Sequence, residues 1–478
     1  MNKLFLLLIP LLLSGFIHLW NPVGYPDVFF DEGIYMRRAV NLLETGNPQE
    51  GNVYDHPYFG QIAIASVLAI TNYSDIKPDT NPESLQSLYW IPRIFMGVLA
   101  VLDTFLIYKI VQIRYGGIAS FLSASLFAVL PFTWIFKRIL LDSIVVPLVL
   151  GAILLAIYST KTKQKRVLII FSGCLLGLAV FTKIPAFTMI FVVAWIIYTD
   201  RKKISDILLL LIPFALIPLI WPVNAIILDQ FDLWQKGVLW QAHRTNSVLD
   251  IFGFLAVIDP MMFVLGLSGI IIAALRKDKF LLLWFIPFIV FLSVVGYKQY
   301  FHWMIVVPAM CIAAGILLES IRKWNIIKKT TYAWIISAVL IFGFVSTTLL
   351  IINDVSINQF QALSYVLENY DDRVTILTSP VYSWILYEVF ERENTPKDYS
   401  FILFYPPDTE KTVIMVDEHY RIDLARGPQL QNAIDRSTIV KTFDGIITKF
   451  NSKIYPYTNM QANGEATQIQ IREGMRVR

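Results

Sequence analysis

Long apolar runs recur along most of the chain, and polar residues gather in the loops between them. An α-helix of about 20 apolar residues can cross a bilayer. The chain has about eleven such runs: Leu4–Trp20, Trp90–Val111, Ile118–Ile135, Ile139–Tyr158, Val167–Phe181, Pro185–Tyr198, Ile207–Ile227, Ile251–Leu275, Phe280–Val295, Met304–Glu319 and Tyr332–Ile352. This pattern predicts an all-α polytopic membrane bundle over residues 1–352, with the first run kept as a helix and not cleaved as a signal peptide.

The basic residues predict how the bundle is oriented. If Lys3 is inside, five basic loops fall on that same side: Lys109–Arg114, Lys161–Arg166, Arg201–Lys203, Arg276–Lys279 and Arg322–Lys329. Basic loops face the cytoplasm. We therefore expect a multi-pass protein of the cell membrane, with a cytoplasmic N-terminus. The short run Phe59–Ile70 is then an interfacial helix in a large extracytoplasmic loop, residues 21–89, because a further crossing would put the basic loops outside.

The composition becomes polar after Ile352. Residues 353–457 are predicted to form a small soluble α/β domain on the extracytoplasmic side. Helices are expected at Asn358–Tyr370 and Val381–Glu391, and β-branched residues predict strands at Arg373–Thr378 and Thr412–Val416. The tail, residues 458–478, has few large apolar side chains and is expected to be disordered.

Composition supports the membrane assignment and narrows the chemistry. The 478 residues are 56% hydrophobic and 16% charged, whereas soluble proteins carry about 25% charged residues. The net charge of +4 gives no reason to expect a nucleic-acid partner. Both cysteines, Cys174 and Cys311, lie in apolar runs, which argues against a disulfide framework or a metal cluster. No cofactor is expected, although the residues do not exclude a requirement for a divalent metal ion.

The loop 21–89 carries candidate acid–base residues. Asp31 and Glu32 follow two phenylalanines, and Asp55-His56-Pro57 precedes the interfacial helix. A carboxylate at a partly apolar boundary has a raised pKa and can act as a general base towards a hydroxyl. In the structural alternative, Asp31 caps a helix running through Ala39, with Glu32 in its first turn. The two interpretations are compatible if only one acid does chemistry, and His56 alone is more typical of a hydrogen-bonded structural residue.

Cations also collect on the predicted outer face, where the charge rule does not expect them. They are Arg93, Lys137, Arg138, Lys183, His243, Arg244, Lys298 and His302. Ionisable groups at membrane depth are costly and are usually functional or paired. Each one could instead snorkel or neutralise an acid such as Asp142. Together they favour a seat for a phosphate-bearing lipid, with Arg making bidentate contacts and Lys a point charge.

These residues form an ordered set that resembles a known family. The set comprises Asp31-Glu32 with Tyr35, His56-Pro57 with Gly60, Arg93, the run Arg138 to Ser143 with Asp142, the run Gly177 to Lys183, and the segment Lys298 to Pro308. Along roughly the first 320 residues, their order is similar to that in the polytopic C-type glycosyltransferases that use polyprenyl-phosphate sugars. The nearest relatives are the protein O-mannosyltransferases and the lipid A aminoarabinose transferase.

The resemblance implies a membrane glycosyltransferase that moves a sugar from a polyprenyl-phosphate donor to a hydroxyl of a protein, lipid or glycan. Asp31 takes the role of base, Glu32 and His56 position it or the acceptor, and the remaining members of the set bind substrate. Gln61 stands where the family often has a basic residue, which leaves the phosphate to Arg138, Lys183 or Lys298. Ile34 also departs from the basic residue of the lipid A enzyme, so the specificity is expected to differ.

Two other functions fit a polytopic chain. A transporter or lipid flippase is the main alternative; it predicts charges near the bilayer midplane and often repeated halves, neither of which the sequence shows. A structural or sensory membrane protein would make the C-terminal domain the working part. The Trp-Trp-Asp-x-Gly motif of oligosaccharyltransferases is absent from the sequence, which argues against transfer to asparagine.

Overall fold

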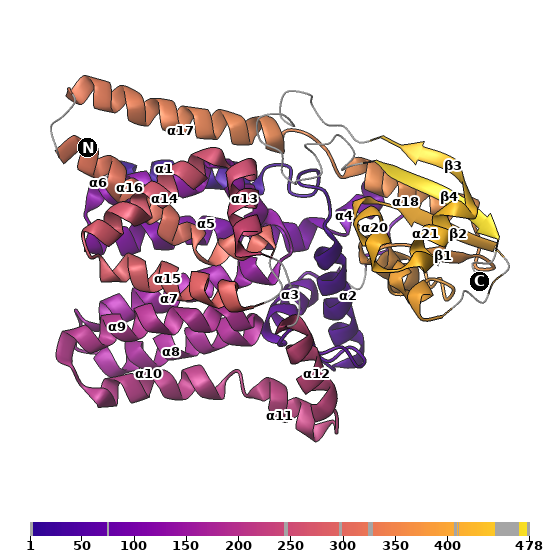
Figure 1. Ribbon diagram of the computed structural model, residues 1–478, viewed down its shortest axis with the longest axis horizontal. Coiled ribbons are helices and arrows are strands. Elements are labelled where there is room, and N and C mark those ends of the chain that lie inside the picture. The colour runs from indigo at the N-terminus through magenta and orange to yellow at the C-terminus, as the bar shows by residue number, and fades with distance from the viewer. Residues whose placement is uncertain are drawn as a thin grey trace.

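The computed structural model describes residues 3–73, 76–242, 247–295, 299–323, 328–405, 409, 411–444 and 468–475. Figure 1 shows a long helical bundle with a smaller domain packed against one end. The bundle helices are α1 (Lys3–Leu19), α5 (Trp90–Arg114), α6 (Gly117–Val129), α7 (Leu141–Ser159), α8 (Lys165–Thr182), α9 (Ile190–Arg201), α10 (Ile204–Leu216), α11 (Ile220–Ile227), α13 (Val248–Ile258), α14 (Pro260–Leu275), α15 (Lys279–Val294), α16 (Val307–Lys323) and α17 (Lys329–Ile351).

Every predicted apolar run overlaps at least one of these helices, but the helices do not settle the number of crossings. Among the described residues, five helices are long and apolar enough to cross a membrane, or six if the bent pair of α6 and η2 (Pro131–Lys137) counts as one span. The expected count of about eleven is therefore not confirmed. Several runs are divided by breaks, as at Asp259 between α13 and α14, and each piece is then too short to span alone. Helices α10 and α11 count together as one span, Ile204–Ile227.

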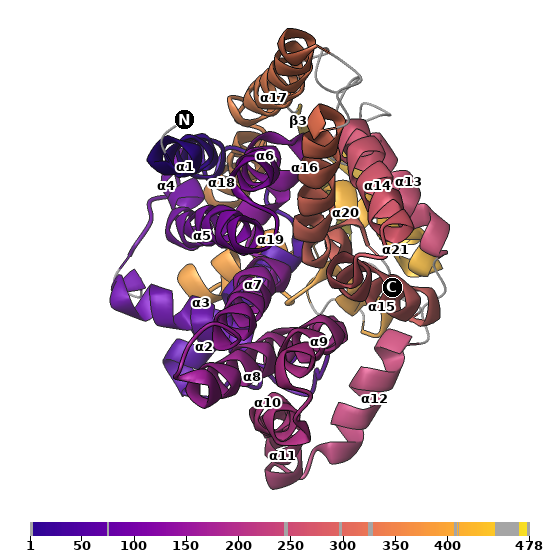
Figure 2. The same cartoon turned by 90° about the vertical axis from the view of Figure 1, so that its left-hand side faces the viewer.

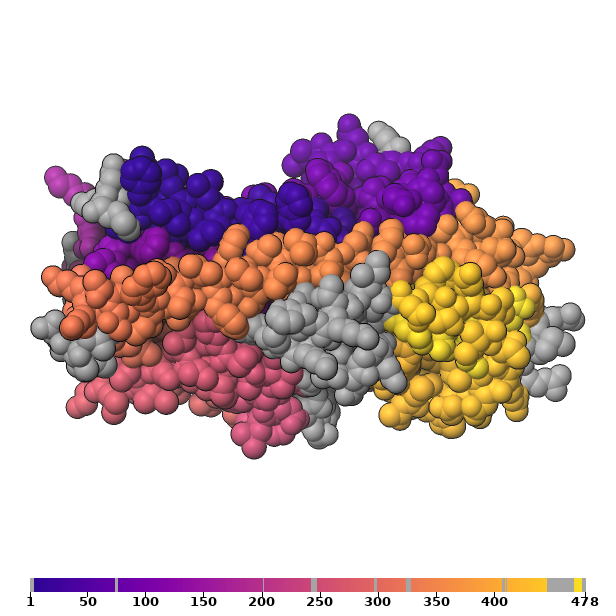
Figure 3. Space-filling model, turned by 90° about the horizontal axis from the view of Figure 1, so that it is seen from above, coloured from indigo at the N-terminus to yellow at the C-terminus, as the bar shows by residue number. Residues whose placement is uncertain are grey.

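The outermost helices fit a lipid surround. In the most apolar 18-residue stretch of α10 and α11, only 17% is buried inside the protein. The corresponding share for α17 is 22%. Figure 3 shows α17 lying along the outside of the bundle and leading to the C-terminal domain. Contact of these apolar surfaces with lipid has no free-energy cost, whereas their contact with water would be unfavourable. The chain is a multi-pass membrane protein.

Four short helices gather at the end of the bundle nearest the C-terminal domain (Figure 1). They are α2 (Phe30–Thr45), α3 (Phe59–Ile70), α4 (Pro82–Ser87) and α12 (Phe231–Ala242). The short helix predicted at Phe59–Ile70 is confirmed with the same bounds. The amphipathic α12 was not predicted. Seen along the helices in Figure 2, it crosses beside the bundle between α11 and α15.

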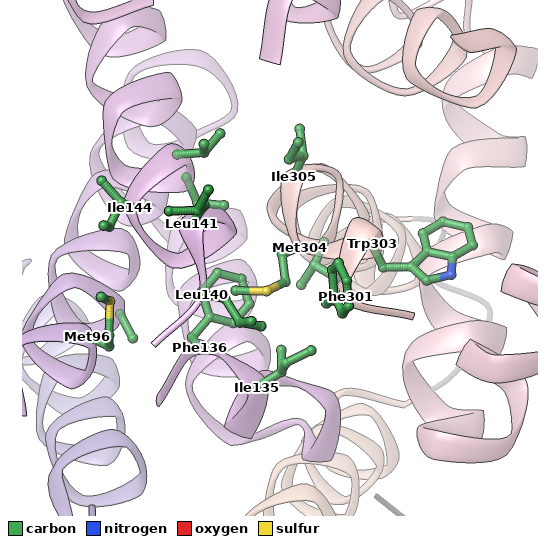
Figure 4. Close-up of a cluster of buried hydrophobic side chains, with 14 of the residues drawn as sticks. Met96, Ile135, Phe136, Leu140, Leu141, Ile144, Phe301, Trp303, Met304 and Ile305 are labelled. Carbon is green, nitrogen blue, oxygen red and sulfur yellow. The ribbon is translucent and has the colours of Figure 1, made fainter. Parts of the chain in front are cut away.

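A dense apolar core supports this end of the bundle. Figure 4 shows side chains from α5, η2, α7 and η4 (Tyr300–Ile305) pointing towards one another, among them Phe136, Leu140 and Met304. All three are at most 1% exposed. The turns η2 and η4 are 3-10 helices, which are used in short pieces where a helix is broken. They bring the flanking polar residues to the same end of the bundle.

The C-terminal domain is a four-stranded sheet with helices, as the α/β prediction expected. Its strands are β1 (Thr375–Leu377), β2 (Lys411–Val416), β3 (Ser437–Phe443) and β4 (Ile469–Met475), in the order β1-β2-β4-β3. Strands β1 and β2 are parallel, and β4 is antiparallel to both β2 and β3. The helices are α18 (Ile357–Asn369), α19 (Pro380–Trp384), α20 (Glu418–Asp423) and α21 (Pro428–Asp435), with the shorter turns η5 (Ile385–Val389), η6 (Tyr399–Leu403) and η7 (Leu424–Arg426).

The expectation of a disordered tail over residues 458–478 is wrong for Ile469–Met475. This segment forms β4 at the centre of the sheet, where Ile469 and Ile471 are buried. Its few apolar residues alternate with polar ones, so one face can be buried even though the composition is polar. Residues 458–467 and 476–478 lie outside the described residues.

The C-terminal domain is joined to the loop that carries α2. The Gln359 side chain acts as a strand partner for Val28: Val28 N donates to Gln359 Oε1 at 2.7 Å, and Gln359 Nε2 donates to Val28 O at 2.9 Å. Gly33 of α2 lies against Pro380, and a Cβ atom there would be 2.2 Å from the Pro380 carbonyl oxygen. Glycine is therefore required for this close approach.

Candidate functional site

A cavity of about 220 Å³ opens at the end of the bundle beside α2. Its polar lining is Asp31, Asp55, His56, Lys183, Gln241 and His302, and its apolar lining is Ile184, Pro185, Val238, Phe291, Leu292, Val295 and Phe301. Four of the predicted site residues, Asp31, His56, Lys183 and His302, thus meet in one place. Polar groups converging in a mostly apolar cavity are typical of ligand sites.

Asp31 lies in the first turn of α2 and is not its N-cap. The N-cap is Phe29, whose backbone N–H donates to Glu32 Oε1 at 3.0 Å. Asp31 is consequently left to face the cavity. Burial raises its pKa to about 6, with the charge of Lys183 opposing the rise and those of Asp55 and Asp142 adding to it. A carboxyl with this pKa is ionised at neutral pH and is a stronger base than an exposed aspartate.

Glu32, the predicted catalytic partner, is turned away from the cavity and fully paired. Arg93 Nε and Nη2 donate to its two oxygens at 2.9 and 2.7 Å, and Ile139 N donates to Oε2 at 2.9 Å. Neither Glu32 nor Arg93 is exposed. Arg93 also donates to the carbonyl oxygens of Pro22, Val23, Pro26 and Asp27. The pair therefore shapes the loop before α2 and does not line the cavity.

Arg138 also stands behind the cavity wall. Its Nη2 donates to Asp27 Oδ1 at 2.7 Å, Nη1 lies 3.6 Å from Glu32 Oε1, and its guanidinium stacks over Phe29 with 4.9 Å to the ring centroid. Lys137 is likewise internal, because its Nζ donates to Trp20 O at 2.7 Å. Lys137 and Arg138, both predicted for the outer face, bind backbone carbonyl oxygens and carboxylates and do not line the cavity.

Among the described lysine and arginine residues predicted as site cations, Lys183 lines the cavity and Arg93 and Arg138 do not. Lys183 follows the last residue of α8, where the chain turns into η3 (Ile184–Met189). Lys183 Nζ donates to Asp142 Oδ2 at 2.5 Å and lies 4.7 Å from the ring centroid of Phe301. Asp142 Oδ1 accepts no hydrogen bond from any described residue. Asp142 is thus predicted correctly as a neighbour of the cation, but it does not line the cavity.

Of the five remaining predicted residues, the structure describes two. Tyr35 is buried behind His56, with 6.2 Å between their ring centroids. His302 Nδ1 accepts the backbone N–H of Gln299 at 2.9 Å, which leaves the proton of a neutral ring on Nε2. His243, Arg244 and Lys298 lie outside the described residues.

Three parts of the cavity were not among the predicted site residues: Asp55, Gln241 and the apolar wall from α15. Asp55 was seen only as the residue before His56, although its carboxylate lines the cavity. Gly60, from the same motif, allows α3 to pack on α7, since a Cβ atom there would be 2.3 Å from Leu141. Among the residues described, no three His, Cys, Asp or Glu side chains are grouped to hold a metal ion.

Comparison with known proteins supports the fold. Residues 84–225 match the family model described as dolichyl-phosphate-mannose-protein mannosyltransferase. The crystal structure of ArnT from Cupriavidus metallidurans in the apo state is 14% identical with a TM-score of 0.57, covering 88% of this chain and 94% of that one. The same protein bound to undecaprenyl phosphate is 11% identical with a TM-score of 0.54, covering 98% of this chain and 97% of that one.

An archaeal structure is similar as well. The oligosaccharyltransferase AglB from Archaeoglobus fulgidus, in complex with an inhibitory peptide and a dolichol-phosphate, is 14% identical with a TM-score of 0.55, covering 90% of this chain and 71% of that one. A comparison with curated protein sequences found no match. The predicted resemblance is thus confirmed at the level of the fold, and the family model matches part of the bundle. The chain has the C-type glycosyltransferase fold of enzymes that use polyprenyl-phosphate sugars.

Proposed function

We propose that the chain transfers a sugar from a polyprenyl-phosphate donor to an acceptor hydroxyl at the extracytoplasmic end of the bundle, with Asp31 as general base. The observation that carries this proposal is the shared cavity of Asp31 and Lys183, a proton acceptor and a phosphate-binding cation beside an apolar wall. Two of the similar structures contain undecaprenyl phosphate and dolichol-phosphate, respectively, which agrees with such a donor.

The apolar wall suits the prenyl tail. Phe291, Leu292 and Val295, at the end of α15, face the cavity. Val290 and Val294, on other faces of the same helix, are 57% and 81% exposed. The cavity is therefore bordered by a helix that also meets lipid, and an apolar tail can lie there while its phosphate reaches Lys183.

The proposed reaction is one displacement with inversion. Asp31 removes the proton of the acceptor hydroxyl as its oxygen attacks the anomeric carbon. The bond between that carbon and the phosphate oxygen breaks, and polyprenyl phosphate leaves with the electron pair. Lys183 stabilises the charge that develops on the phosphate, a contribution that is large in a cavity shielded from water. His302 lines the same cavity as Lys183.

The geometry gives Glu32 and Arg93 a positioning role in this proposal. They fix the loop that ends at Phe29, so the first turn of α2 presents Asp31 and not Glu32 to the cavity. Arg138 supports the same loop through Asp27. The phosphate contact considered for Arg138 is therefore assigned to Lys183.

Transfer can be tested in membranes that contain the protein and are given radiolabelled polyprenyl-phosphate sugar. Asp31→Asn should abolish most of the transfer, whereas Asp372→Asn, the same change at a carboxylate with a 69% exposed side chain, should not affect it. Undiminished transfer by the Asp31 variant would exclude Asp31 as the base. Consumption of donor without a glycosylated product would favour a flippase or transporter instead.

The side of the membrane needs its own test. Single cysteines at Asp79 and Lys163, both exposed, can be introduced after replacement of Cys174 and Cys311. A membrane-impermeant maleimide added to intact cells should label position 79 and not position 163. The reverse pattern would place the cavity on the cytoplasmic side and contradict the proposed location.

A further inference from the structure

We propose that Asp55 binds the transferred sugar itself, as the acceptor of a hydrogen bond from a ring hydroxyl or amine. This inference rests on the proposed function and deepens it: Lys183 recognises the phosphate of the donor, and Asp55 recognises its sugar. Asp55 would then be a residue that determines which sugar is accepted.

The position of Asp55 is the first argument. Its side chain is 21% exposed, and it lines the cavity together with Asp31 and Lys183. Asp55 Oδ1 lies 2.9 Å from Arg38 Nη1, so one oxygen of the carboxylate is held from behind. The exposed part of the carboxylate faces the cavity and is available to a ligand.

A chain of charges, buried except at Lys397, fixes this carboxylate in place. Arg38 Nε lies 3.8 Å from Glu50 Oε2, and Glu50 Oε1 lies 2.8 Å from Arg37 Nε and 2.5 Å from Lys397 Nζ. Arg38 and Glu50 are each 7% exposed. Lys397 belongs to the C-terminal domain, so that domain closes the chain. Alternating charges of this kind keep the groups ionised and hold their geometry.

The two carboxylates of the cavity therefore differ in chemistry. Burial alone would raise the pKa of Asp55, but the charges of Arg38 and His56 and the hydrogen bond from Arg38 lower it to about 2. At a pH near 6, at which Asp31 can take up a proton, Asp55 stays ionised. An ionised carboxylate accepts hydrogen bonds and donates none. It would repel a phosphate and attract a hydroxyl or an ammonium group.

This difference orients the donor. With the phosphate at Lys183 and a sugar hydroxyl or amine at Asp55, the sugar ring lies between the two groups. Asp31 lines the same cavity and can reach an acceptor hydroxyl there. A site that hydrogen-bonds one substituent of a substrate strongly rejects analogues that lack it. Asp55 consequently gives the cavity a preference among sugars that Lys183 alone cannot give.

The test compares equilibrium binding of lipids to the full chain in nanodiscs. The probes are undecaprenyl phosphate without sugar and undecaprenyl phosphate bearing mannose, glucose or an amino sugar. Asp55→Asn should weaken binding of the preferred sugar-bearing lipid by about 10- to 100-fold, the effect of losing one hydrogen bond to a charged group. Binding of undecaprenyl phosphate should not change. Preference for the amino sugar would identify the partner as an amine, and preference for a hexose as a hydroxyl.

Two variants separate contact from folding. Asp55→Glu keeps the charge beside Arg38, so it should remain folded while its sugar preference changes; Asp372→Asn should behave like the wild type. Equal loss of affinity for all four lipids, or no loss for any, would overturn the assignment, as would a wild type that binds sugar-bearing lipids no better than undecaprenyl phosphate. Failure of the wild type to bind undecaprenyl phosphate at all would instead refute the proposed function.

Discussion

Asp31→Asn and Glu32→Gln make the same chemical change at adjacent residues, and we expect them to have opposite effects on stability. Glu32 is unexposed and accepts four hydrogen bonds, from Phe29 N, from Arg93 Nε and Nη2, and from Ile139 N. Glutamine cannot accept all of them, and Arg93 would be left without its counter-charge. Breaking a buried ion pair by removing one partner costs about 3–5 kcal/mol. That is a large part of the usual stability of a folded domain, about 5–15 kcal/mol.

Asp31→Asn removes a buried carboxylate that forms no ion pair with any of the described residues. Burial raises the pKa of Asp31 from its ordinary value of 3.8 to about 6. A carboxyl whose pKa is higher in the folded protein stabilises it at low pH, and this stability is lost as the pH rises through 6. Above pH 6 the ionised form destabilises the fold by at most about 3 kcal/mol. The asparagine variant should therefore be as stable as the wild type, or more stable, at pH 7.5.

The assay combines thermal unfolding in detergent with single-turnover transfer at pH 7.5. Asp31→Asn should unfold at or above the wild-type Tm and lose transfer by about 10²- to 10⁴-fold, the usual contribution of a general base. Glu32→Gln should have a clearly lower Tm. Its remaining folded fraction should keep more transfer activity than the Asp31 variant. A Glu32 variant of wild-type stability that loses only transfer would refute this reasoning and return Glu32 to the chemistry.

Three further predictions follow from the same geometry. Transfer under kcat/KM conditions should fall as the pH drops through about 6, because Asp31 must be ionised to act as a base, and Asp31→Asn should abolish this limb of the pH profile. Lys183→Met should weaken binding of undecaprenyl phosphate by about 10- to 100-fold, as expected for loss of a charged hydrogen-bond donor; unchanged binding would remove Lys183 from the phosphate site. Gly33→Ala should reduce both stability and transfer, because its Cβ would meet the Pro380 carbonyl at 2.2 Å, whereas Gly253→Ala, with no atom within 4 Å, is the control expected to be neutral in both measurements.

The helices were predictable because a helix that crosses a bilayer needs a long run of apolar residues, and such runs are visible in the sequence. The interfacial helix Phe59–Ile70 was found with its correct bounds from the length of its apolar run and the charges of later loops. The breaks inside runs were not predicted. The one at Ile217–Leu219 contains Pro218, which interrupts a helix although it adds to the apolar run. Strand β4 was missed because its place depends on pairing with β2 and β3. The paired residues lie 26 or more positions away along the chain, so the pairing was not visible as a local pattern.

The site was predictable in residue types and less so in their roles. Asp31 and Lys183 were placed correctly at one end because both follow from the loop order. Arg93 looked equally suited to bind phosphate, but the loop before α2 folds around it and satisfies it with carbonyl oxygens. That arrangement depends on backbone geometry. Asp55 could have been found from its place beside His56, an acid and an imidazole on the same predicted outer loop.

The central claim is that Asp31 performs chemistry in a cavity whose lipid-binding parts are separate from it. The most direct test measures undecaprenyl phosphate binding and sugar transfer on the same preparation of the Asp31→Asn protein. We predict lipid binding like that of the wild type together with transfer reduced by at least about 100-fold. Transfer at the wild-type rate from a protein that binds the lipid normally would contradict the account.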